Sequence, residues 1–221
     1  MSNFDIVFSQ WPKFLAGFQT TTMLLVVSAI GAFFVGVGCL YLLNTRSKAL
    51  RRITVGYIDT MRMLPFLMFV YLLYYGLPAA GIQMTAIFAS IMGLSLYHGA
   101  YFAEIMRGAW NQLPVGQTES ARAHGLYGLR LIRRIILPQL LGRSAPMLGN
   151  QLIYLLKDTS FLVIISVQEL TWAASAVQSQ YFVPLEPFVV AIALYWLLTL
   201  IIEFGINQLH RVAKEKGLGR A

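Results

Sequence analysis

Charged residues are scarce in this sequence. Asp, Glu, Lys and Arg together make up 12% of the 221 residues, about half the share that is usual in soluble globular proteins. None of them occurs between Arg62 and Glu104, whereas hydrophobic residues make up 57% of the chain and the mean hydropathy is +0.65. These values exclude an ordinary soluble domain, because a lipid bilayer is the environment that suits so long an uncharged stretch.

Cysteine is almost absent too. Cys39 is the only cysteine and lies within a hydrophobic run, which excludes a disulfide framework and a cysteine zinc site. We expect a buried, unreactive thiol at this position, and we expect no metal site in the chain.

Signatures of catalysis are missing as well. The sequence has no G-x-x-x-x-G-K-S/T loop to hold ATP phosphates, and no Ser-His-Asp, H-E-x-x-H or cysteine cluster. We therefore predict that the chain is not an enzyme, has no catalytic residue and binds no cofactor of its own. The net charge of +8 would suit nucleic acid. The positive charges flank hydrophobic runs, however, which favours the lipid bilayer as a partner and argues against nucleic acid.

Hydrophobic runs of about 20 residues, the length that crosses a bilayer as a helix, recur along the chain. They cover residues 21–43, 53–77, 85–106, 146–167 and 187–209. They do not show the period of two that membrane β-strands require. The sequence therefore predicts an all-α integral membrane protein with about five transmembrane helices, forming one domain over residues 1–221. We identify no removable signal peptide, and we expect the first run to direct insertion.

Basic residues gather on one side of these runs. Fourteen of the 17 Lys and Arg residues lie in the loop after the first run, the loop after the third run and the C-terminal tail. They are Arg46, Lys48, Arg51, Arg52, Arg107, Arg122, Arg130, Arg133, Arg134, Arg143, Arg211, Lys214, Lys216 and Arg220. Because cytoplasmic loops are enriched in Lys and Arg, we expect the C-terminus in the cytoplasm and the N-terminus outside.

The longest polar segment, residues 109–145, lies on the basic side. A connection of this length usually has structure or function of its own. Residues 119–124 favour a helix, and Gly125 is a natural helix stop. A second helical run follows up to Leu137, where we expect Pro138 to interrupt it. The segment therefore predicts a helix–glycine–helix hairpin at the cytoplasmic surface.

The spacing within this hairpin resembles a known motif. Glu119-Ser120-Ala121 is followed after three residues by Gly125 and, after nine more, by Ile135-x-Leu137-Pro138. This resembles the EAA motif of ATP-binding-cassette (ABC) importer permeases, with Ser120 in place of an alanine and His124 where leucine is common. The resemblance implies a coupling helix that docks on the ATPase subunit through Glu119, Ser120, Ala121, Gly125, Ile135, Leu137 and Pro138. The alternative for Glu119 is an acid in the first turn that favours a helix N-terminus.

Further segments resemble the polar amino-acid permeases of that family. They are Tyr57-Ile-Asp-Thr-Met-Arg62-Met-Leu-Pro65, Ala100-Tyr-Phe-Ala-Glu104-Ile-Met-Arg107-Gly, Leu156-Lys157-Asp158-Thr159-Ser160 with Glu169-Leu170 after it, and Gly17-Phe-Gln-Thr-Thr21. The resemblance implies a multi-pass permease subunit in the bacterial inner membrane that carries polar or charged amino acids. It also implies three partners: an ATPase dimer that holds ATP and Mg, a second permease subunit, identical or paralogous, and an extracytoplasmic amino-acid-binding protein.

Ionisable residues within or near the runs are candidates for a substrate pathway, because charges in hydrocarbon are costly unless paired or wetted. The candidates are Asp59, Arg62, His98, Glu104, Lys157 and Asp158. An amino-acid zwitterion needs a cation for its carboxylate and an anion for its amine, and this set supplies both.

A structural role for these residues stays open. Asp59 and Arg62 lie three residues apart, as do Glu104 and Arg107, so each pair can form a local ion pair. Lys157 and Asp158 are adjacent and point about 100° apart, so we expect at least one to find a partner elsewhere. His98 is equally interpreted as a hydrogen-bonded core residue.

Two other classes of protein fit the hydrophobic runs without the motifs. A secondary transporter or channel would work without an ATPase, and inverted repeats would favour it. A membrane enzyme would need a catalytic cluster at one membrane face. The sequence leaves open which amino acid is carried.

Overall fold

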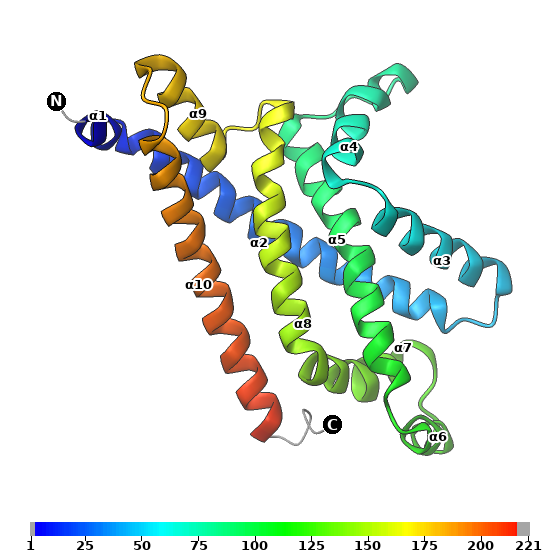
Figure 1. The fold of residues 1–221 in the computed structure, drawn as a ribbon. Helices are drawn as coiled ribbons and strands as arrows, with labels where there is room; N and C mark the ends of the chain where they lie inside the picture. Colours follow the sequence, from blue (N-terminus) through cyan, green and yellow to red (C-terminus); the bar gives the residue numbers. More distant parts are fainter. Residues whose placement is uncertain (1–2, 216–221) are drawn as a thin grey trace. The chain divides into compact units, whose positions relative to one another are not determined.

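The computed structural model describes residues 3–215, and Lys216 and Arg220 of the basic tail lie outside these. Every regular element in this part of the chain is helical (Figure 1). The α-helices are α1 (Asn3–Ser9), α2 (Trp11–Leu43), α3 (Lys48–Met63), α4 (Phe66–Tyr71), α5 (Ala86–Asn111), α6 (Val115–Ala123), α7 (Gly128–Leu131), α8 (Leu137–Asp158), α9 (Leu170–Tyr181) and α10 (Glu186–Glu215). The π-helical turns η1 (Leu72–Gly76) and η3 (Ile132–Ile136) and the 3-10 segments η2 (Leu77–Ala80) and η4 (Thr159–Ile165) complete the order.

The long helices confirm an all-α membrane protein. α2, α5, the continuous helix Gly128–Ile165 and α10 are each long and apolar enough to cross a bilayer. A bent pair, Lys48–Met63 with Phe66–Ala80, passes the same test together and makes a fifth span if it crosses as one. This agrees with the prediction of about five transmembrane helices.

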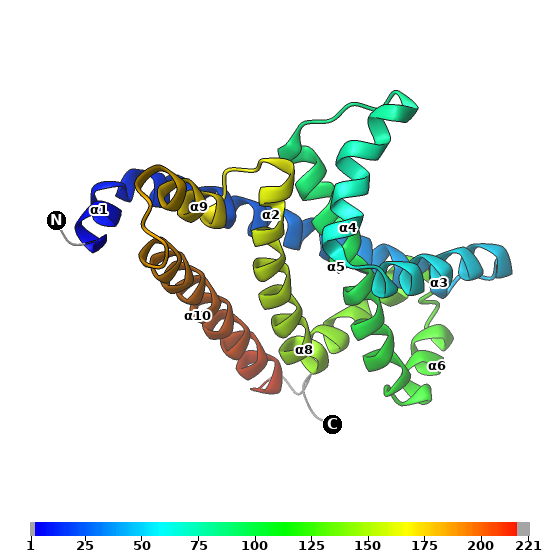
Figure 2. The same cartoon turned by 45° about the horizontal axis from the view of Figure 1, so that its top comes forward.

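The second predicted run is not one helix. α3 starts at Lys48, where the Ser47 hydroxyl accepts a hydrogen bond from the Leu50 N–H at 3.4 Å. It ends before Pro65, because a proline disfavours helical geometry in the preceding residue, and Leu64 is extended with φ −87° and ψ 142°. Figure 2 shows α3 and α4 as separate helices before and after this break. Pro65 thus divides the predicted run 53–77 into separate helices.

The prediction that Pro138 interrupts the second arm of the hairpin is wrong. The helix continues from α7 through η3 into α8, and Pro138 is the second residue of α8. Immediately before it, the Leu137 N–H donates to the Ile132 carbonyl, five residues back, in a π-turn. The wider turn relieves the clash between a proline ring and the carbonyl of the preceding turn, so the helix tolerates the proline. Pro146, expected at the start of the fourth span, also lies inside α8.

The chain forms two compact units. One comprises the described part of residues 1–30 with Pro65–Leu94 and Leu152–Ile201, and the other comprises Gly31–Leu64, Ser95–Gln151 and the described part of residues 202–221. Each of the four long helices α2, α5, α8 and α10 contributes a part to both units.

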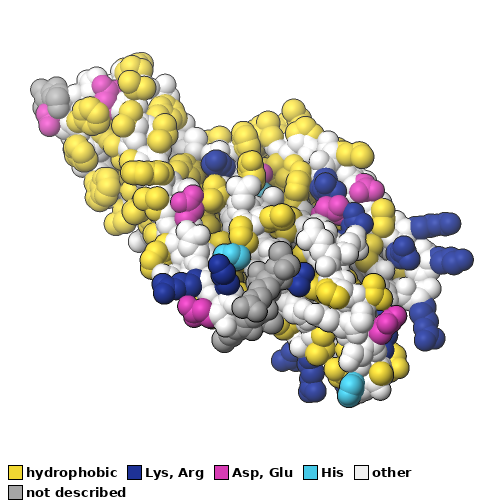
Figure 3. All heavy atoms as spheres, turned by 60° about the horizontal axis from the view of Figure 1, so that its bottom comes forward, with side chains coloured by type: hydrophobic (Ala, Val, Ile, Leu, Met, Phe, Trp, Pro, Cys, Tyr) yellow, Lys and Arg dark blue, Asp and Glu magenta, His cyan; other side chains and the backbone are white. Residues whose placement is uncertain are grey.

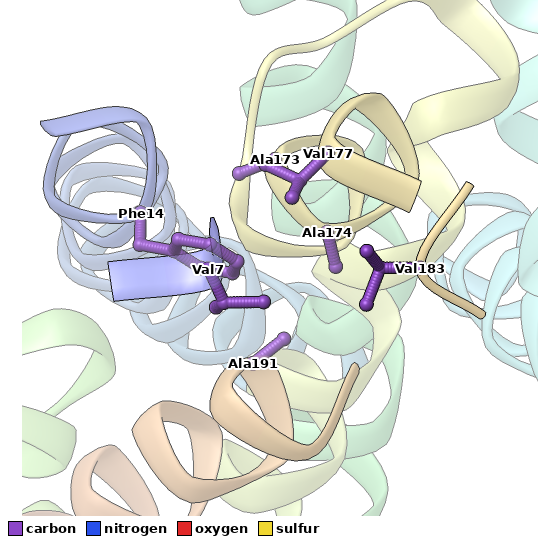
Figure 4. Packing of buried hydrophobic residues seen from close by; sticks show 7 residues of the cluster. All are labelled: Val7, Phe14, Ala173, Ala174, Val177, Val183 and Ala191. Carbon is purple, nitrogen blue, oxygen red and sulfur yellow. The ribbon is translucent and has the colours of Figure 1, made fainter. Parts of the chain in front are cut away.

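The first unit has an apolar core around α9. Val7, Phe14, Ala173, Ala174, Val177, Val183 and Ala191 form a buried cluster to which α1, α2, α9, α10 and the α9–α10 connection contribute (Figure 4). α9 is an element that the sequence did not predict, since it lies between the hydrophobic runs 146–167 and 187–209. Its small and apolar residues are buried by neighbouring helices, so the packing rather than an apolar run stabilises it.

In the second unit, α2 and α5 approach closely. A Cβ built on Gly99 would lie 2.5 Å from Cγ1 of Val35, and one on Gly31 would lie 2.3 Å from the Ser95 hydroxyl. Glycine is required at both positions because any side chain would force the helices apart, as at small-residue interfaces between membrane helices. Cys39 is buried against Ile58 and Ala103, and the prediction of a buried thiol is confirmed.

Candidate functional site

The hairpin of residues 119–138 is closed by a glycine turn. α6 ends at Ala123, and Gly125 adopts a left-handed conformation with φ +78°. The Gly125 N–H donates to the Arg122 carbonyl at 2.9 Å, and the Leu126 N–H donates to the Ala121 carbonyl at 3.0 Å. These two bonds make a Schellman motif, which satisfies carbonyls that a helix C-terminus leaves without partners. The predicted helix stop at Gly125 is confirmed.

The second arm packs under the first. Leu131, Ile132 and Ile136 are fully buried, and α6 lies against α7 and η3. An open groove of about 430 Å³ runs between the arms. Its lining residues are Gly116, Gln117, Ser120, Ala121, His124, Leu126, Ile135 and Gln139. The His124 ring contributes to the turn, with Nδ1 at 2.8 Å from the Ser120 carbonyl.

The predicted coupling residues divide by exposure. Glu119, Ser120 and Gly125 are exposed, Ala121 is buried, and Ile135, Leu137 and Pro138 are partly buried. Glu119 is the fifth residue of α6, so the alternative of a first-turn acid at the helix N-terminus is not supported. A partner can therefore reach the 119–120 surface, while the residues from 135 to 138 fix the hairpin to α8.

Sequence reasoning missed the apolar part of the hairpin surface. Val115, Tyr127 and Leu129 are 71%, 62% and 58% exposed. Where such side chains form one contiguous patch, they are typical of an interaction surface. Their apolar character within a polar loop was the signal that could have identified them.

A second group of functional residues joins α3 to α5. The Tyr97 hydroxyl donates to the Leu64 carbonyl at 2.9 Å, and the Tyr101 hydroxyl donates to the Arg62 carbonyl at 3.3 Å. Tyr57 donates in the other direction, to the Leu96 carbonyl of α5 at 2.5 Å. Tyr97 and Tyr101, one turn apart on α5, thus bind carbonyls at the end of α3, where Pro65 interrupts the helical hydrogen bonds.

Charges beside these tyrosines form one cluster. Arg107 donates to both carboxylate oxygens of Glu104, from Nε at 2.8 Å and from Nη2 at 2.6 Å, so this predicted pair is confirmed. Arg62 lies 3.4 Å from the same carboxylate and over the Tyr101 ring. The expected local pair of Asp59 with Arg62 is therefore replaced by an interhelical pair of Arg62 with Glu104.

His98 is held inside the second unit. It is fully buried, and its Nδ1 lies 2.8 Å from Nε2 of Gln151 on α8. Its ring packs edge-on against Tyr97. The interpretation as a hydrogen-bonded core residue is confirmed.

Lys157 and Asp158 belong to the first unit, at the end of α8. The Lys157 side chain is exposed and lies 5.8 Å from the centre of the Tyr154 ring, while Asp158 is partly buried. The structure thus places the six pathway candidates in two groups, with Asp59, Arg62, His98 and Glu104 in the second unit.

Glu169, which follows the Leu156–Ser160 segment in the sequence and had no predicted role, is the most buried acid among the described residues. Its Oε1 accepts the Trp172 N–H at 2.8 Å, which caps α9, and its Oε2 accepts the Tyr195 hydroxyl of α10. The next N–H, of Leu170, donates to the Thr21 hydroxyl of α2 at 3.2 Å. Burial raises the pKa of the Glu169 carboxyl, although these hydrogen bonds oppose the shift. Glu169 therefore joins α9 to α10, and the adjacent Leu170 N–H joins α9 to α2.

Known proteins share this arrangement. A family model described as "Binding-protein-dependent transport system inner membrane component" matches residues 32–213. The probable glutamine ABC transporter permease protein GlnM of Bacillus subtilis is 30% identical over 95% of this chain and 97% of its own. The glutamine transport system permease protein GlnP of Escherichia coli is 30% identical over 92% and 94%.

Solved structures agree. The crystal structure of an amino acid ABC transporter with histidines matches with a TM-score of 0.80 at 28% identity, over 90% of this chain and 94% of that one. An inward-facing structure of the MetNI methionine ABC transporter, at 18% identity, shares the fold with a TM-score of 0.76 over 94% and 97%. In this family the permease works with a partner permease, and ATP hydrolysis belongs to a separate ATPase. The chain belongs to the binding-protein-dependent inner membrane components and is a multi-pass permease subunit of an ABC importer for polar amino acids.

Proposed function

We propose that this subunit moves a polar or charged amino acid across the bacterial inner membrane, from an extracytoplasmic binding protein to the cytoplasm. Two permease subunits, identical or paralogous, form the pathway, and an ATPase dimer that binds ATP and Mg drives it. The basic side, with the hairpin, faces the cytoplasm, as the distribution of Lys and Arg favours. Relatives named for glutamine and nopaline transport support an amino-acid substrate.

The hairpin of residues 119–138 transmits the movement of the ATPase. The observation that carries this proposal is the continuous helix from Gly128 to Ile165, which passes through Pro138 without a break. A displacement of the exposed α6 surface is transferred to α8 because the Schellman turn and the buried Leu131, Ile132 and Ile136 hold α6 against the second arm of the hairpin. ATP-driven closure thus reorients a membrane helix directly.

Charge reversal on α6 tests this proposal. We expect Glu119→Lys to abolish ATP-driven uptake in proteoliposomes while the permease still folds and inserts. Glu215→Lys is the matched control, because Glu215 is also exposed but lies at the end of α10. Uptake by Glu119→Lys at the wild-type rate would refute a role for this surface.

Gly125→Pro tests the turn itself. Proline removes the N–H that donates to the Arg122 carbonyl and fixes φ near −65°, which is incompatible with the observed +78°. We expect the ATPase to remain active without driving uptake. Normal coupling in this variant would show that the hairpin geometry is not used.

The ionisable groups near the spans bind the amino acid while it crosses the membrane. Glu104 with Arg62 and Arg107, and Lys157 with Asp158, offer an anion for the α-amine and cations for the carboxylate. Two variants separate this role from a purely structural one. If Asp158→Asn or Glu104→Gln raises the KM of uptake with unchanged thermal stability, the residue binds substrate. If only stability falls, it is a structural ion pair.

A further inference from the structure

A pocket lies at the basic end of α2, between this helix, α3 and α5. Its volume is about 310 Å³, and all its lining residues belong to the second unit. They are Leu40, Leu43, Asn44, Arg51, Val55, Arg107, Trp110 and Asn111. The proposed coupling and transport roles use none of them except Arg107.

The lining of this pocket combines two kinds of side chain. Leu40, Leu43 and Val55 supply an apolar wall, whereas Asn44, Asn111 and the two arginines supply hydrogen-bond donors and positive charge. None of the eight lining residues is acidic. Glu104 binds Arg107 through Nε and Nη2, and Arg51 extends from the first turns of α3. Because Glu104 pairs with Arg107, the net positive charge of the lining comes from Arg51, and it lies beside apolar side chains.

The surroundings add further positive charge. Arg46, Lys48 and Arg52 flank the α2–α3 connection, and the sequence contains no Asp or Glu between Asp5 and Asp59. Figure 3 shows Lys and Arg side chains gathered along one edge of the molecule. The pocket lies where an apolar span ends, the level at which tryptophans such as Trp110 sit at the membrane–water interface. Basic pockets of this kind between membrane helices bind anionic lipid head groups.

We propose that this pocket binds the phosphate head group of an anionic phospholipid. Arg51 and Arg107 bind the phosphate oxygens by charge-assisted hydrogen bonds, and Asn44 and Asn111 bind the remaining polar groups of the head. The glycerol and the first acyl carbons lie along Leu40, Leu43 and Val55. The lipid thereby contacts α2, α3 and α5, and Arg107 is the one lining residue that it shares with the proposed substrate-binding groups.

Lipid binding by the full-length permease, purified in detergent and delipidated, tests the proposal. Native mass spectrometry would measure the affinity for phosphatidylglycerol and for phosphatidylcholine. Removing one Arg contact to an anionic head group weakens binding by roughly fivefold, and we expect this for Arg51→Gln. Arg52→Gln is the matched control, since it removes the same charge from the next residue, which does not line the pocket. We expect a change of less than about twofold there, as for a screened surface charge.

Two further experiments identify the ligand. Leu43→Trp fills the apolar end without changing charge, and we expect it to weaken phosphatidylglycerol binding as well. Inorganic phosphate at a large excess would not displace the lipid if the apolar wall contributes. Equal losses in Arg51→Gln and Arg52→Gln, or equal binding of the zwitterionic lipid, would overturn the proposal in favour of general surface attraction. If phosphate displaces the lipid and Leu43→Trp has no effect on lipid binding, the proposal would be overturned in favour of a simple anion site.

Discussion

α6 and α9 are both short helices outside the membrane spans, and they are held in opposite ways. α6 is stabilised locally by the Schellman turn at Gly125 and leaves Glu119 and Ser120 exposed. α9 buries Ala173, Ala174 and Val177 completely and is capped by the buried Glu169. The helix that we propose to contact the ATPase therefore keeps its outer surface exposed, whereas α9 buries much of its surface against neighbouring helices.

The largest effect is expected at the cap of α9. Glu169→Ala removes the cap and takes the acceptor from the partly buried Trp172 N–H and from one hydrogen bond of the Tyr195 hydroxyl. We expect a loss of about 3 kcal/mol in the free energy of unfolding, from a cap and a buried hydrogen bond together. Thermal unfolding in detergent measures it. Glu119→Ala is the control on α6, and an equal loss there would remove the contrast between the two helices.

A larger side chain in the core tests the second difference between α6 and α9, which is how tightly each helix is packed. Ala174→Leu adds volume to a fully buried position of α9, which costs about 2 kcal/mol in a well-packed core. Ala123→Leu adds the same volume at an exposed position of α6. We expect only the first variant to lower the melting temperature. A similar fall in both would mean that α6 is packed as tightly as α9.

A smaller effect is expected at the α6 turn. Gly125→Ala places a side chain in the left-handed region at φ +78°, which costs about 1 kcal/mol. Because the strain is local, hydrogen exchange should rise at the amides of residues 125 and 126 while α9 is unchanged. Gly116→Ala, in the helical part of α6 with open space around an added Cβ, should not raise exchange. Faster exchange across α9 in Gly125→Ala would contradict local stabilisation.

The smallest effect is a pH dependence at Glu169. Its pKa is raised in the folded protein by burial, so folding favours the protonated carboxyl. The stabilising contribution is present below the usual glutamate pKa and is lost as the pH rises through the raised value. The melting temperature of wild type relative to Glu169→Gln should therefore fall with rising pH. If the melting temperature of wild type relative to Glu169→Gln rose with pH instead, the hydrogen bonds to the carboxylate would outweigh the effect of its burial.

Sequence reasoning located the hairpin because its signals are local. Gly125 ends a helix by its own backbone freedom, and the spacing from Glu119 to Pro138 is readable along the chain. Family membership also decides against the secondary transporter, channel and membrane enzyme that the hydrophobic runs alone allowed.

The features that the sequence did not reveal depend on contacts between distant segments. α9 has no long apolar run and is a helix because α1, α2 and α10 bury its small residues. Tyr97 and Tyr101 reach carbonyls more than 30 residues away. Pro138 lies in a continuous helix because η3 widens the turn before it, and single-residue propensities do not indicate such a turn.

The central claim is that the exposed surface of α6 contacts the ATPase. Cys39 is buried, so a cysteine introduced at Ser120 can be labelled selectively with a photoreactive maleimide in the assembled importer. We predict that illumination crosslinks the permease to the ATPase from position 120 and not from a cysteine at the exposed Ser179 of α9. An intact importer that gives no ATPase crosslink from position 120, or an equal one from position 179, would contradict the account.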